Sequence, residues 1–453
     1  PIPIMDHALK MDDEMTYFPR NTFDQCVDFI VSDCQYGIDG ALPMIYTNAS
    51  GTVAESLYGR ATKAAAYALK ARVLLYAASP LFNGNADYAK FANEDGTLLF
   101  APKDDSKWGK AAAAAKEAID KIEGSSYYGL YYSDEPDNGY RNYMELFLPS
   151  KKWNKEYIFA RNQGTGYSDN IHQEKCMAAN GMGGWSGLCP TQELVDAYEM
   201  ANGSTPIIGY NADGTPIING ASGYSETGFA ATAGKHYPAG VYNMYVGREP
   251  RFYASINFNG QQWRGRQLEF WQGGKDGINV SKVDYCCTGY LLRKTADEGV
   301  DVINGKGGMK EASILFRVGS LYLDYAEALN EAEGPVDDVY KYVDAIRKRA
   351  GLPGLAKGLD KDKMRERIQH ERQIELAFEA GHRYFDCHRW KIAEKTDNGY
   401  MHGMNITATN KVDYSKRSTV GDSRVFEKKH YLFPIPQSEM DKRIGLVQSP
   451  YWE

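Results

Sequence analysis

The chain has 453 residues, of which 43% are hydrophobic and 25% charged, and its formal net charge is −7; this is an ordinary globular balance with ample material for a core. The acidic balance and the absence of a long basic run exclude nucleic acid as a natural partner, and no apolar stretch reaches the roughly 18 residues that span a bilayer. The chain opens with PIPIMDH, without an initiator methionine or an apolar leader segment. We therefore expect that a leader has been removed or that the sequence is a fragment.

Three apolar stripes in the first part of the chain predict helices. Thr22 and Gln25 stand at capping-box spacing and mark the start of the first helix. Pro80 stops the second helix, and Ser106 is the expected N-cap of the third. The stripes are Phe23, Val27, Ile30 and Cys34; Ala66, Leu69, Val73 and Tyr76; and Trp108, Ala111, Ala115, Ala118 and Ile122.

The clearest unit is a helical hairpin over residues 316–351. Gly334 and Pro335 divide it, and Pro335 suits the first position of the second helix. The hairpin has about the length of a tetratricopeptide repeat, and residues 60–122 form a similar but irregular pair. The stripes of the hairpin are Val318, Leu321, Tyr325, Ala328 and Ala332, then Val336, Val339, Val343, Ile346 and Ala350. The sequence therefore predicts a mainly α fold of irregular tetratricopeptide-like hairpins that bury their faces against one another.

Residues 124–310 have a different character. Gly, Asn, Ser, Tyr and Trp dominate, turn signals such as NGMGGWSG and NFNGQQWRG recur, and alternating pieces such as RFYASINFNG predict short strands. A loop-rich insertion on a rigid scaffold is where binding residues usually lie. The chain also carries 33 tyrosines, whose flat rings with a polar tip suit a surface that grips partly polar ligands.

These changes of character divide the chain into four parts that we expect to form one integrated domain. They are a first helical part over 1–123, an aromatic insertion over 124–310, a second helical part over 311–393 and an irregular C-terminal segment over 394–453.

The stretch ERQIELAFEAGHRYFDCHRW, residues 371–390, concentrates residue types that bind metals or catalyse reactions. On a helix His382 and Asp386 share a face, whereas Cys387 and His388 point elsewhere, so these potential ligands do not converge. Gly381 is expected to end one helix and to begin a short second one. Glu379 and Arg383 stand in the favourable order for an ion pair if helix geometry persists across the glycine. We interpret the stretch as structural.

The same stretch closely resembles the C-terminal signature of the SusD/RagB family, outer-membrane nutrient-binding lipoproteins of Bacteroidetes. Other segments match in the family's order: RNTFDQCVDFIVSDC, ATKAAAYALKARVLLYAASPLFNG, PTQELVDAYEM, EPRFYASI, ILFRVGSLYLDYAEALNEA and YLFPIPQSEM. The chain departs from the family pattern at Cys387, where Leu or a similar residue is usual, and at His388, where Arg is usual. The family assigns no catalytic role to either position.

The resemblance implies a tetratricopeptide-like scaffold with a loop-rich insertion that sits on the cell surface, in the outer membrane, tethered by an N-terminal lipidated cysteine. Such proteins act as a hinged lid over a SusC-like TonB-dependent transporter and capture glycans, or in some members peptides, for import. Relative to the family pattern, the lipid-anchor cysteine and the first helices are absent from this sequence. No cofactor is implied, no metal ligand set is identified, and the acidic loop DEPDN is compatible with calcium.

Binding of a sugar needs aromatic rings that stack on its apolar face and polar groups that bond its hydroxyls. The insertion supplies both, most densely in QQWRGRQLEFWQGGKDG. The candidate ligand-binding residues are Trp263, Trp271, Trp185, Tyr224, Tyr242, Tyr245, Arg264 and Gln262.

The sequence therefore predicts non-catalytic capture of an oligosaccharide and its delivery to the transporter. A peptide-binding member of the same family remains an alternative. So does a glycoside hydrolase, which requires two carboxylates about 5 to 10 Å apart, although no nucleophile elbow, P-loop or dinucleotide fingerprint occurs. A helical scaffold that binds protein tails is a further alternative, and it predicts a groove between the helices instead of contacts in the insertion.

Overall fold

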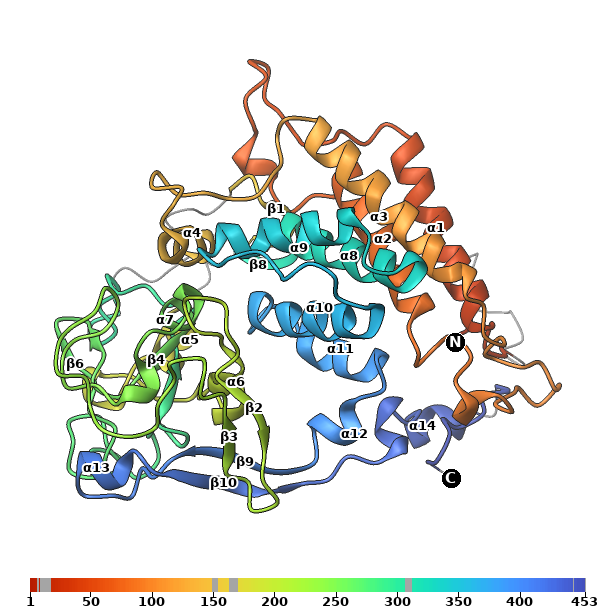
Figure 1. Ribbon diagram of the computed structural model, residues 1–453. Coiled ribbons are helices and arrows are strands. Elements are labelled where there is room, and N and C mark those ends of the chain that lie inside the picture. The colour runs from red at the N-terminus through yellow and green to blue at the C-terminus, as the bar shows by residue number, and fades with distance from the viewer. Residues whose placement is uncertain are drawn as a thin grey trace.

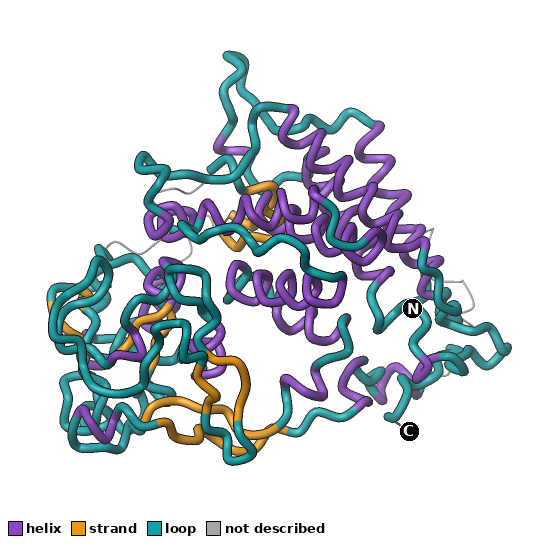
Figure 2. Tube along the Cα trace, in the orientation of Figure 1, coloured by secondary structure: helices purple, strands orange, loops and turns teal. Residues whose placement is uncertain are grey.

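The computed structural model describes residues 1–5, 8, 18–148, 154–162, 170–305, 312–442 and 444–452. Helices gather in one part of the molecule, the scaffold, and a lobe of loops and short strands lies beside them (Figure 1, Figure 2). The expected mainly α fold with a loop-rich insertion is confirmed. No helix within the described ranges is both long enough and apolar enough to cross a membrane.

The scaffold combines helices from both halves of the chain. Helix α3 packs against α2 and α8, α1 packs against α2, and α9 and α10 pack against α8. The helices are α1 (Phe23–Asp39), α2 (Lys63–Ala78), α3 (Ser106–Gly124), α8 (Val318–Glu333), α9 (Asp337–Arg349), α10 (Lys361–Glu375) and α11 (His382–Arg389). Their alanines and valines form one continuous core, so neither half of the scaffold buries its apolar face alone.

The lobe consists mainly of residues between α3 and α8 and has a core of its own, rich in tyrosine and phenylalanine. Its helices are α4 (Gly139–Phe147), α5 (Asn170–Met177), α6 (Gln192–Ala197) and α7 (Pro250–Ser255). Its strands are β2 (Ile207–Tyr210), β3 (Pro216–Ile218), β4 (Ile256–Phe258), β5 (Gln262–Trp263), β6 (Arg266–Gln267) and β7 (Tyr290–Leu292). The strands pair antiparallel as β2–β3, β4–β7 and β5–β6.

Two further strand pairs connect the lobe to the rest of the chain. Strand β1 (Tyr157–Asn162) pairs antiparallel with β8 (Ala312–Arg317), so the chain leaves the scaffold and returns to it at one place. The C-terminal segment contains α12 (Ala393–Thr396), β9 (Gly399–Met404), α13 (Lys411–Tyr414), β10 (Arg417–Arg424) and α14 (Gln437–Met440). Its strands β9 and β10 pair and run along the lobe (Figure 1), and Met404 and Tyr414 belong to the lobe's core. The predicted boundaries at 124 and 311 stay predictions.

Several local expectations hold. The capping box of Thr22 and Gln25 is present at the start of α1, and the expected stripe of α3 is buried apart from a half-buried Trp108. Helix α9 carries acidic residues in its first turn and basic residues in its last, which complements the helix dipole. In the hairpin, Ala332 and Val336 are exposed, whereas the other stripe residues are buried.

Other expectations are wrong in detail. Pro335 lies before the N-cap Val336 and not at the first helical position, and Asp105 is the N-cap of α3, with Ser106 as its first residue. In the segment RFYASINFNG only Ile256–Phe258 is a strand. The residues RFYAS belong to helix α7, which starts at Pro250 because proline suits a first helical turn.

The face predicted for α2 is also wrong. Leu69 is 38% exposed, and the other members of that stripe are only partly buried. The helix is apolar on most of its circumference, so periodicity cannot select its core face. The packing of α3 and α8 selects it, and the buried residues are Ala64, Ala65, Tyr67, Ala68, Ala71, Leu75, Ala77 and Ala78.

The stretch 371–390 forms the end of α10, a break and α11. Gly381 adopts φ = 72° and is the N-cap of α11, so the predicted start of a second helix is confirmed. The expectation that Gly381 ends the first helix is wrong, because α10 already ends at Glu375. Helix geometry does not persist across the break, so the condition for the predicted Glu379–Arg383 ion pair is not met. Glu379 accepts hydrogen bonds at 2.7 Å from Lys294 Nζ and from Arg317 Nε. Within the described residues, no group of three or more His, Cys, Asp or Glu side chains is arranged to hold a metal.

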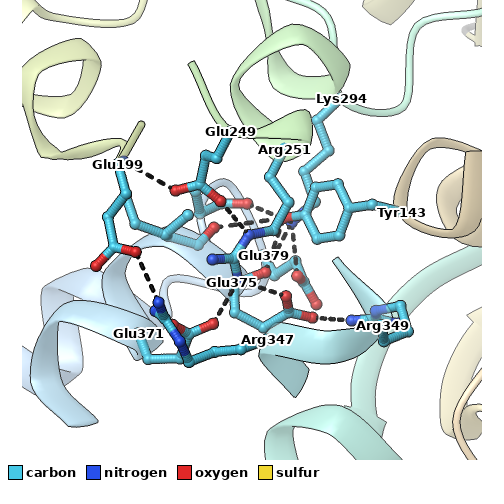
Figure 3. Close-up of polar contacts among 12 residues, drawn as sticks. Tyr143, Glu199, Glu249, Arg251, Lys294, Arg347, Arg349, Glu371, Glu375 and Glu379 are labelled. Carbon is cyan, nitrogen blue, oxygen red and sulfur yellow. Dashed lines mark hydrogen bonds and ion pairs between the residues drawn. The ribbon is translucent and has the colours of Figure 1, made fainter. Parts of the chain in front are cut away.

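Glu379 belongs to a buried cluster of charged side chains that we call the central ion network (Figure 3). It joins α10 to α7, α9, β8 and the segments around them. Its members are Glu156, Glu199, Glu249, Arg251, Lys294, Arg317, Arg347, Arg349, Glu371, Glu375 and Glu379, and none is more than 9% exposed. The pairing is dense enough to satisfy most of the charges, as burial of ions requires.

Glu375 lies at the centre of this network. It accepts hydrogen bonds from Arg317 Nη1 at 2.9 Å and from Arg251 Nη1 at 3.0 Å, and it also pairs with Arg349. Burial opposes ionisation of this carboxyl, but attraction to Arg349, Arg317 and Arg251 outweighs it and lowers the pKa of Glu375 to about 2. The carboxylate is therefore charged at neutral pH and holds three arginines from three separate parts of the chain.

A second buried cluster lies on the other side of α10. Arg372 Nη1 donates to Asp324 of α8 at 2.7 Å, and Arg372 Nε donates to Asp386 of α11 at 2.9 Å. Arg389 joins Asp386 to Glu327. The charged residues of the stretch thus link α8, α10 and α11, and the structural interpretation of this stretch agrees with their geometry.

We expect Glu375→Gln to lower the free energy of unfolding by about 3–5 kcal/mol, because it leaves buried arginines with an uncompensated charge. Asp120→Asn is the matched control, since Asp120 pairs with Lys116 on the exposed surface of α3 and should cost less than about 1 kcal/mol. Urea unfolding followed by circular dichroism measures both. Equal stability of the two variants would contradict the assigned role of the network.

We expect stability to fall as the pH drops from about 6.5 to 4.5. Burial, followed by the charges of Arg72 and Arg372, lowers the pKa of His382 to about 3, so the unfolded chain binds a proton that the folded chain does not. The slope should reach about 1.4 kcal/mol per pH unit for this one proton. In His382→Gln the slope measured by urea unfolding should decrease by that amount, and an unchanged slope would contradict the assignment. Protonation of Glu375 lowers the free energy of unfolding further, but only below about pH 4.5, because the pKa of Glu375 is lower in the folded than in the unfolded chain.

Candidate functional site

The hairpin β5–β6 determines how the candidate residues of QQWRGRQ are oriented. Arg264 and Gly265 have φ of 45° and 83°, as a two-residue hairpin turn with positive φ at both positions requires. Side chains alternate along a strand, so Gln262 points to solvent and Trp263 points inward, where it is only 2% exposed. The glycine after Arg264 is the local sequence signal for this turn.

An open pocket of about 340 Å³ lies beside this hairpin, and we call it the lobe pocket. Residues from α4, from the loop after β3, from β5 and from the end of β7 surround it. The lining residues are Tyr140, Gly234, Lys235, His236, Tyr237, Pro238, Gln261, Gln262 and Arg293. Gln262 is thus the one predicted residue that lines this pocket directly.

Stacked rings form one wall of the lobe pocket. The ring of His236 stacks on Tyr140 with centroids 4.7 Å apart, and it lies 5.2 Å from the ring of Tyr253. Tyr237 stacks on Tyr253 at 6.1 Å. Burial, followed by the charges of Lys235 and Arg293, lowers the pKa of His236 to about 4. The imidazole is therefore neutral at pH 7 and acts as another flat, partly polar ring in this wall.

Arg293 lines both the lobe pocket and a second, smaller cavity of about 110 Å³. Its guanidinium carbon lies 4.6 Å from the ring centre of Trp263 and 5.5 Å from that of Tyr140. Arg293 Nη2 donates to the Tyr140 hydroxyl at 2.5 Å. The two aromatic rings and this hydrogen bond hold the guanidinium in place, and its other N–H groups have no acceptor among the described residues.

None of the other predicted residues lines the lobe pocket directly. Tyr224 and Tyr245 are core residues, 6% and 1% exposed; Tyr245 packs on Phe258, and the Tyr224 hydroxyl donates to Glu226 Oε1 at 2.6 Å. Trp263 lies against Arg293 and lines the cavity of about 110 Å³ behind it. These three rings pack in the core of the lobe, and their role as ligand-binding residues stays a prediction.

The remaining four predicted residues have mixed environments. Arg264 donates to the buried carboxylate of Glu174 at 2.9 Å, which occupies part of its guanidinium. Trp271 is half-buried under Lys411, 5.0 Å away, and Tyr242 is half-buried. Trp185 is 37% exposed and stacks on His172. Their role as ligand-binding residues stays a prediction.

The sequence reasoning missed the other lining residues of the lobe pocket, among them its rings and cations Tyr140, Lys235, His236, Tyr237 and Arg293. The segment GKHYPAG, residues 234–240, carries a usable signal, because a basic residue and two rings stand between glycines inside the insertion. Tyr140 and Arg293 carry no such signal, since they come from α4 and from the end of β7 and meet only through folding.

Other hollows offer fewer free polar groups. In a hollow of about 650 Å³ near the C-terminus, the carboxylate of Asp87 already accepts hydrogen bonds from two lysines and a tyrosine. A groove of about 370 Å³ on α1 and α2 is lined mainly by apolar side chains. In a third hollow, between α3, α8 and α10, Glu331 is held by Arg365. The lobe pocket combines rings with uncommitted polar groups.

Two of the carboxylates of the DEPDN loop are already paired with an arginine. Asp134 and Glu135 pair with Arg141 Nη2 and Nη1 at 2.7 and 2.5 Å. The guanidinium of Arg141 therefore occupies the place that a cation would take beside these two carboxylates.

Comparison with known proteins gives consistent matches. The model of the SusD family matches residues 149–452. The solved structure named BT4246 is 27% identical, with a TM-score of 0.82, over 100% of this chain and 80% of that one. A SusD-like carbohydrate binding protein (BF0978) from Bacteroides fragilis NCTC 9343 is 22% identical, with a TM-score of 0.67, over 97% of this chain and 74% of that one, which is a likeness of fold.

Among curated proteins, SusD-like protein P25 of Formosa agariphila is 42% identical over 82 residues. This match spans 17% of the present chain and only 15% of the relative's length.

We expect Trp263→Ala to destabilise the protein by about 3–5 kcal/mol, because it removes a buried ring from the core. Trp185→Ala is the control and should cost less than about 1 kcal/mol, since that ring is partly exposed. Thermal unfolding measures the difference. A Trp263→Ala protein with unchanged stability and lost ligand binding would identify Trp263 as a contact residue.

Proposed function

Because this chain belongs to the SusD family, we propose that it captures an oligosaccharide at the cell surface without cleaving it and delivers it to a SusC-like TonB-dependent transporter. The observation that carries the proposal is the lobe pocket, where rings and uncommitted polar groups share one wall. The name of BF0978, a carbohydrate binding protein with this fold, supports the same ligand class.

The lobe pocket suits a sugar in size and chemistry. Its volume of about 340 Å³ lies within the range of small-ligand pockets. A pyranose presents C–H groups on its faces, which pack on aromatic rings such as Tyr237, and hydroxyls at its rim, which bond amides such as Gln262 and the donors of Arg293. Because the wall is stacked internally, little side-chain ordering is needed on binding.

Non-catalytic binding fits the composition of the wall. Hydrolysis of a glycosidic bond uses a pair of carboxylates that flank it. The described residues that line the lobe pocket include no Asp or Glu, so this wall supplies neither a general acid nor a nucleophilic carboxylate. The pocket holds a sugar without a group that would cleave it.

The proposal also includes the location of the protein and the way it passes the ligand on. We place the protein on the outer membrane, lipid-anchored at its N-terminus, beside the transporter. The central ion network ties lobe and scaffold together, so a bound glycan and the scaffold would move as one unit.

We expect calorimetric titration against a panel of oligosaccharides and peptides to show saccharide binding. Tyr237→Ala should weaken it by about tenfold, because a stacking ring is lost. Tyr36→Ala is the matched control, since Tyr36 is 84% exposed on α1 and should leave affinity unchanged. Binding of peptides alone, or steady release of reducing ends from a bound glycan, would contradict the proposal.

A further inference from the structure

The lobe pocket is cationic although the whole chain is acidic. Lys235 and Arg293 line it, and its described lining contains no carboxylate. The chain carries a net charge of −7, so this local excess of positive charge runs against the overall balance. A pocket lined by one sign of charge focuses the potential and attracts ligands of the other sign.

Both cations are free of ion pairs in the part of the chain that the structure describes. Arg293 donates only to the Tyr140 hydroxyl and, through its backbone N–H, to Ser255. This contrasts with the buried arginines of the central ion network, such as Arg251 and Arg317, each of which pairs with several carboxylates. The fold pairs its structural arginines directly with carboxylates, whereas Lys235 and Arg293 form no ion pair with a described residue. Lys235 acts on Glu135 only through its charge, which helps to lower the pKa of that carboxyl.

The neighbouring carboxylates are engaged elsewhere. Glu298 lines the smaller cavity behind Arg293, and its Oε1 accepts the backbone N–H of Arg264 at 3.0 Å. Glu135 is held by Asn138 and Arg141, and these contacts lower the pKa of its carboxyl. Neither carboxylate lies within ion-pair distance of Lys235 or Arg293.

The charges of Lys235 and Arg293 both affect the same residue of the pocket wall, His236. Lys235 and Arg293 each disfavour protonation of His236, which lies on the ring of Tyr140. An anionic group placed at this ring would therefore be within the field of both cations. The guanidinium of Arg293 lies 4.6 Å from the ring of Trp263 and 5.5 Å from that of Tyr140, and a guanidinium is the side-chain group best suited to carboxylate or sulfate oxygens.

We propose that the lobe pocket binds an acidic saccharide, one that carries a carboxylate or a sulfate ester, with the anionic group between Lys235 and Arg293. The sugar ring lies against Tyr237 and its hydroxyls bond Gln262. This inference rests on the proposed function and adds the ligand class to it.

The experiment compares matched acidic and neutral probes by calorimetry. In one arm, trigalacturonic acid is compared with α-1,4-linked galactotriose, which differs in its carboxylates. In a second arm, a sulfated galactan tetrasaccharide is compared with its desulfated counterpart. A tetra-aspartate peptide serves as an acidic ligand without a sugar. We expect at least one acidic saccharide to bind at least about tenfold more tightly than its neutral counterpart. The preference should shrink as salt is raised from about 0.01 M to about 0.15 M, because the screening length falls from about 30 to about 8 Å.

Variants at Lys235 test the charge without disturbing the fold, since this side chain is exposed. Lys235→Gln should weaken binding of the acidic saccharide about fivefold and Lys235→Glu more strongly, whereas Lys235→Arg should restore it. Binding of a neutral saccharide should weaken less than binding of the acidic one, because only the acidic saccharide loses an ionic contact. Lys282→Gln, at an exposed lysine that does not line the pocket, is the control and should leave all affinities unchanged.

The outcomes separate this inference from the proposed function. Equal affinity for acidic and neutral probes, with binding still lost in Tyr237→Ala, overturns the acidic class and leaves saccharide capture in place. An acidic preference that Lys235→Glu does not reduce overturns the assigned position of the anion. Binding of the tetra-aspartate peptide alone, or of no saccharide in either arm, overturns both proposals.

Discussion

Burial of the Glu375 carboxylate is the constraint on which the arrangement of this protein depends. A buried charge must be compensated, and Glu375 is compensated by Arg251 of α7, Arg317 of β8 and Arg349 of α9. These residues come from the lobe, from the strand at which the chain returns to the scaffold, and from the scaffold itself; Figure 3 shows Arg251 and Arg349 beside Glu375. The position of α10 therefore sets the position of the lobe relative to the helices.

The central ion network is linked to the lobe pocket through two residues that are neighbours in sequence, Lys294 of the network and Arg293 of the pocket. Lys294 Nζ donates to Glu379, to the Tyr143 hydroxyl and to the carbonyl of Ala377 at 2.7 to 2.8 Å. Arg293, its neighbour in sequence, lines the lobe pocket instead. The buried lysine therefore fixes the backbone directly beside the arginine that lines the lobe pocket. The ion network thus contributes to the site without touching the ligand.

The residue types that suggest chemistry and the residues that form the site are different sets. The stretch 371–390 concentrates Glu, Arg, His and Asp, yet its buried members pair among themselves and with α8 and β8. The lobe pocket is made from ordinary positions on four separate segments. Its distinguishing property is that its cations have no carboxylate partner among the described residues, which only the complete set of contacts reveals. A run of reactive residue types in a sequence is therefore a weaker guide to function than a charged side chain that has no ion-pair partner within the fold.

The sequence by itself determined the family, the mainly α class, the helical hairpin of α8 and α9, the capping box of α1 and the start of α11 at Gly381. Each of these depends on signals within a few residues of one another, namely apolar period, cap residues and a glycine at positive φ. It also located the β5–β6 turn, although not that Trp263 faces inward. Only the tertiary structure decided which face of the uniformly apolar α2 is buried, which arginines are paired, and that Tyr140, His236, Gln262 and Arg293 share one pocket. Those outcomes depend on which segments pack together, and packing between residues more than a hundred positions apart leaves no local pattern in a single sequence.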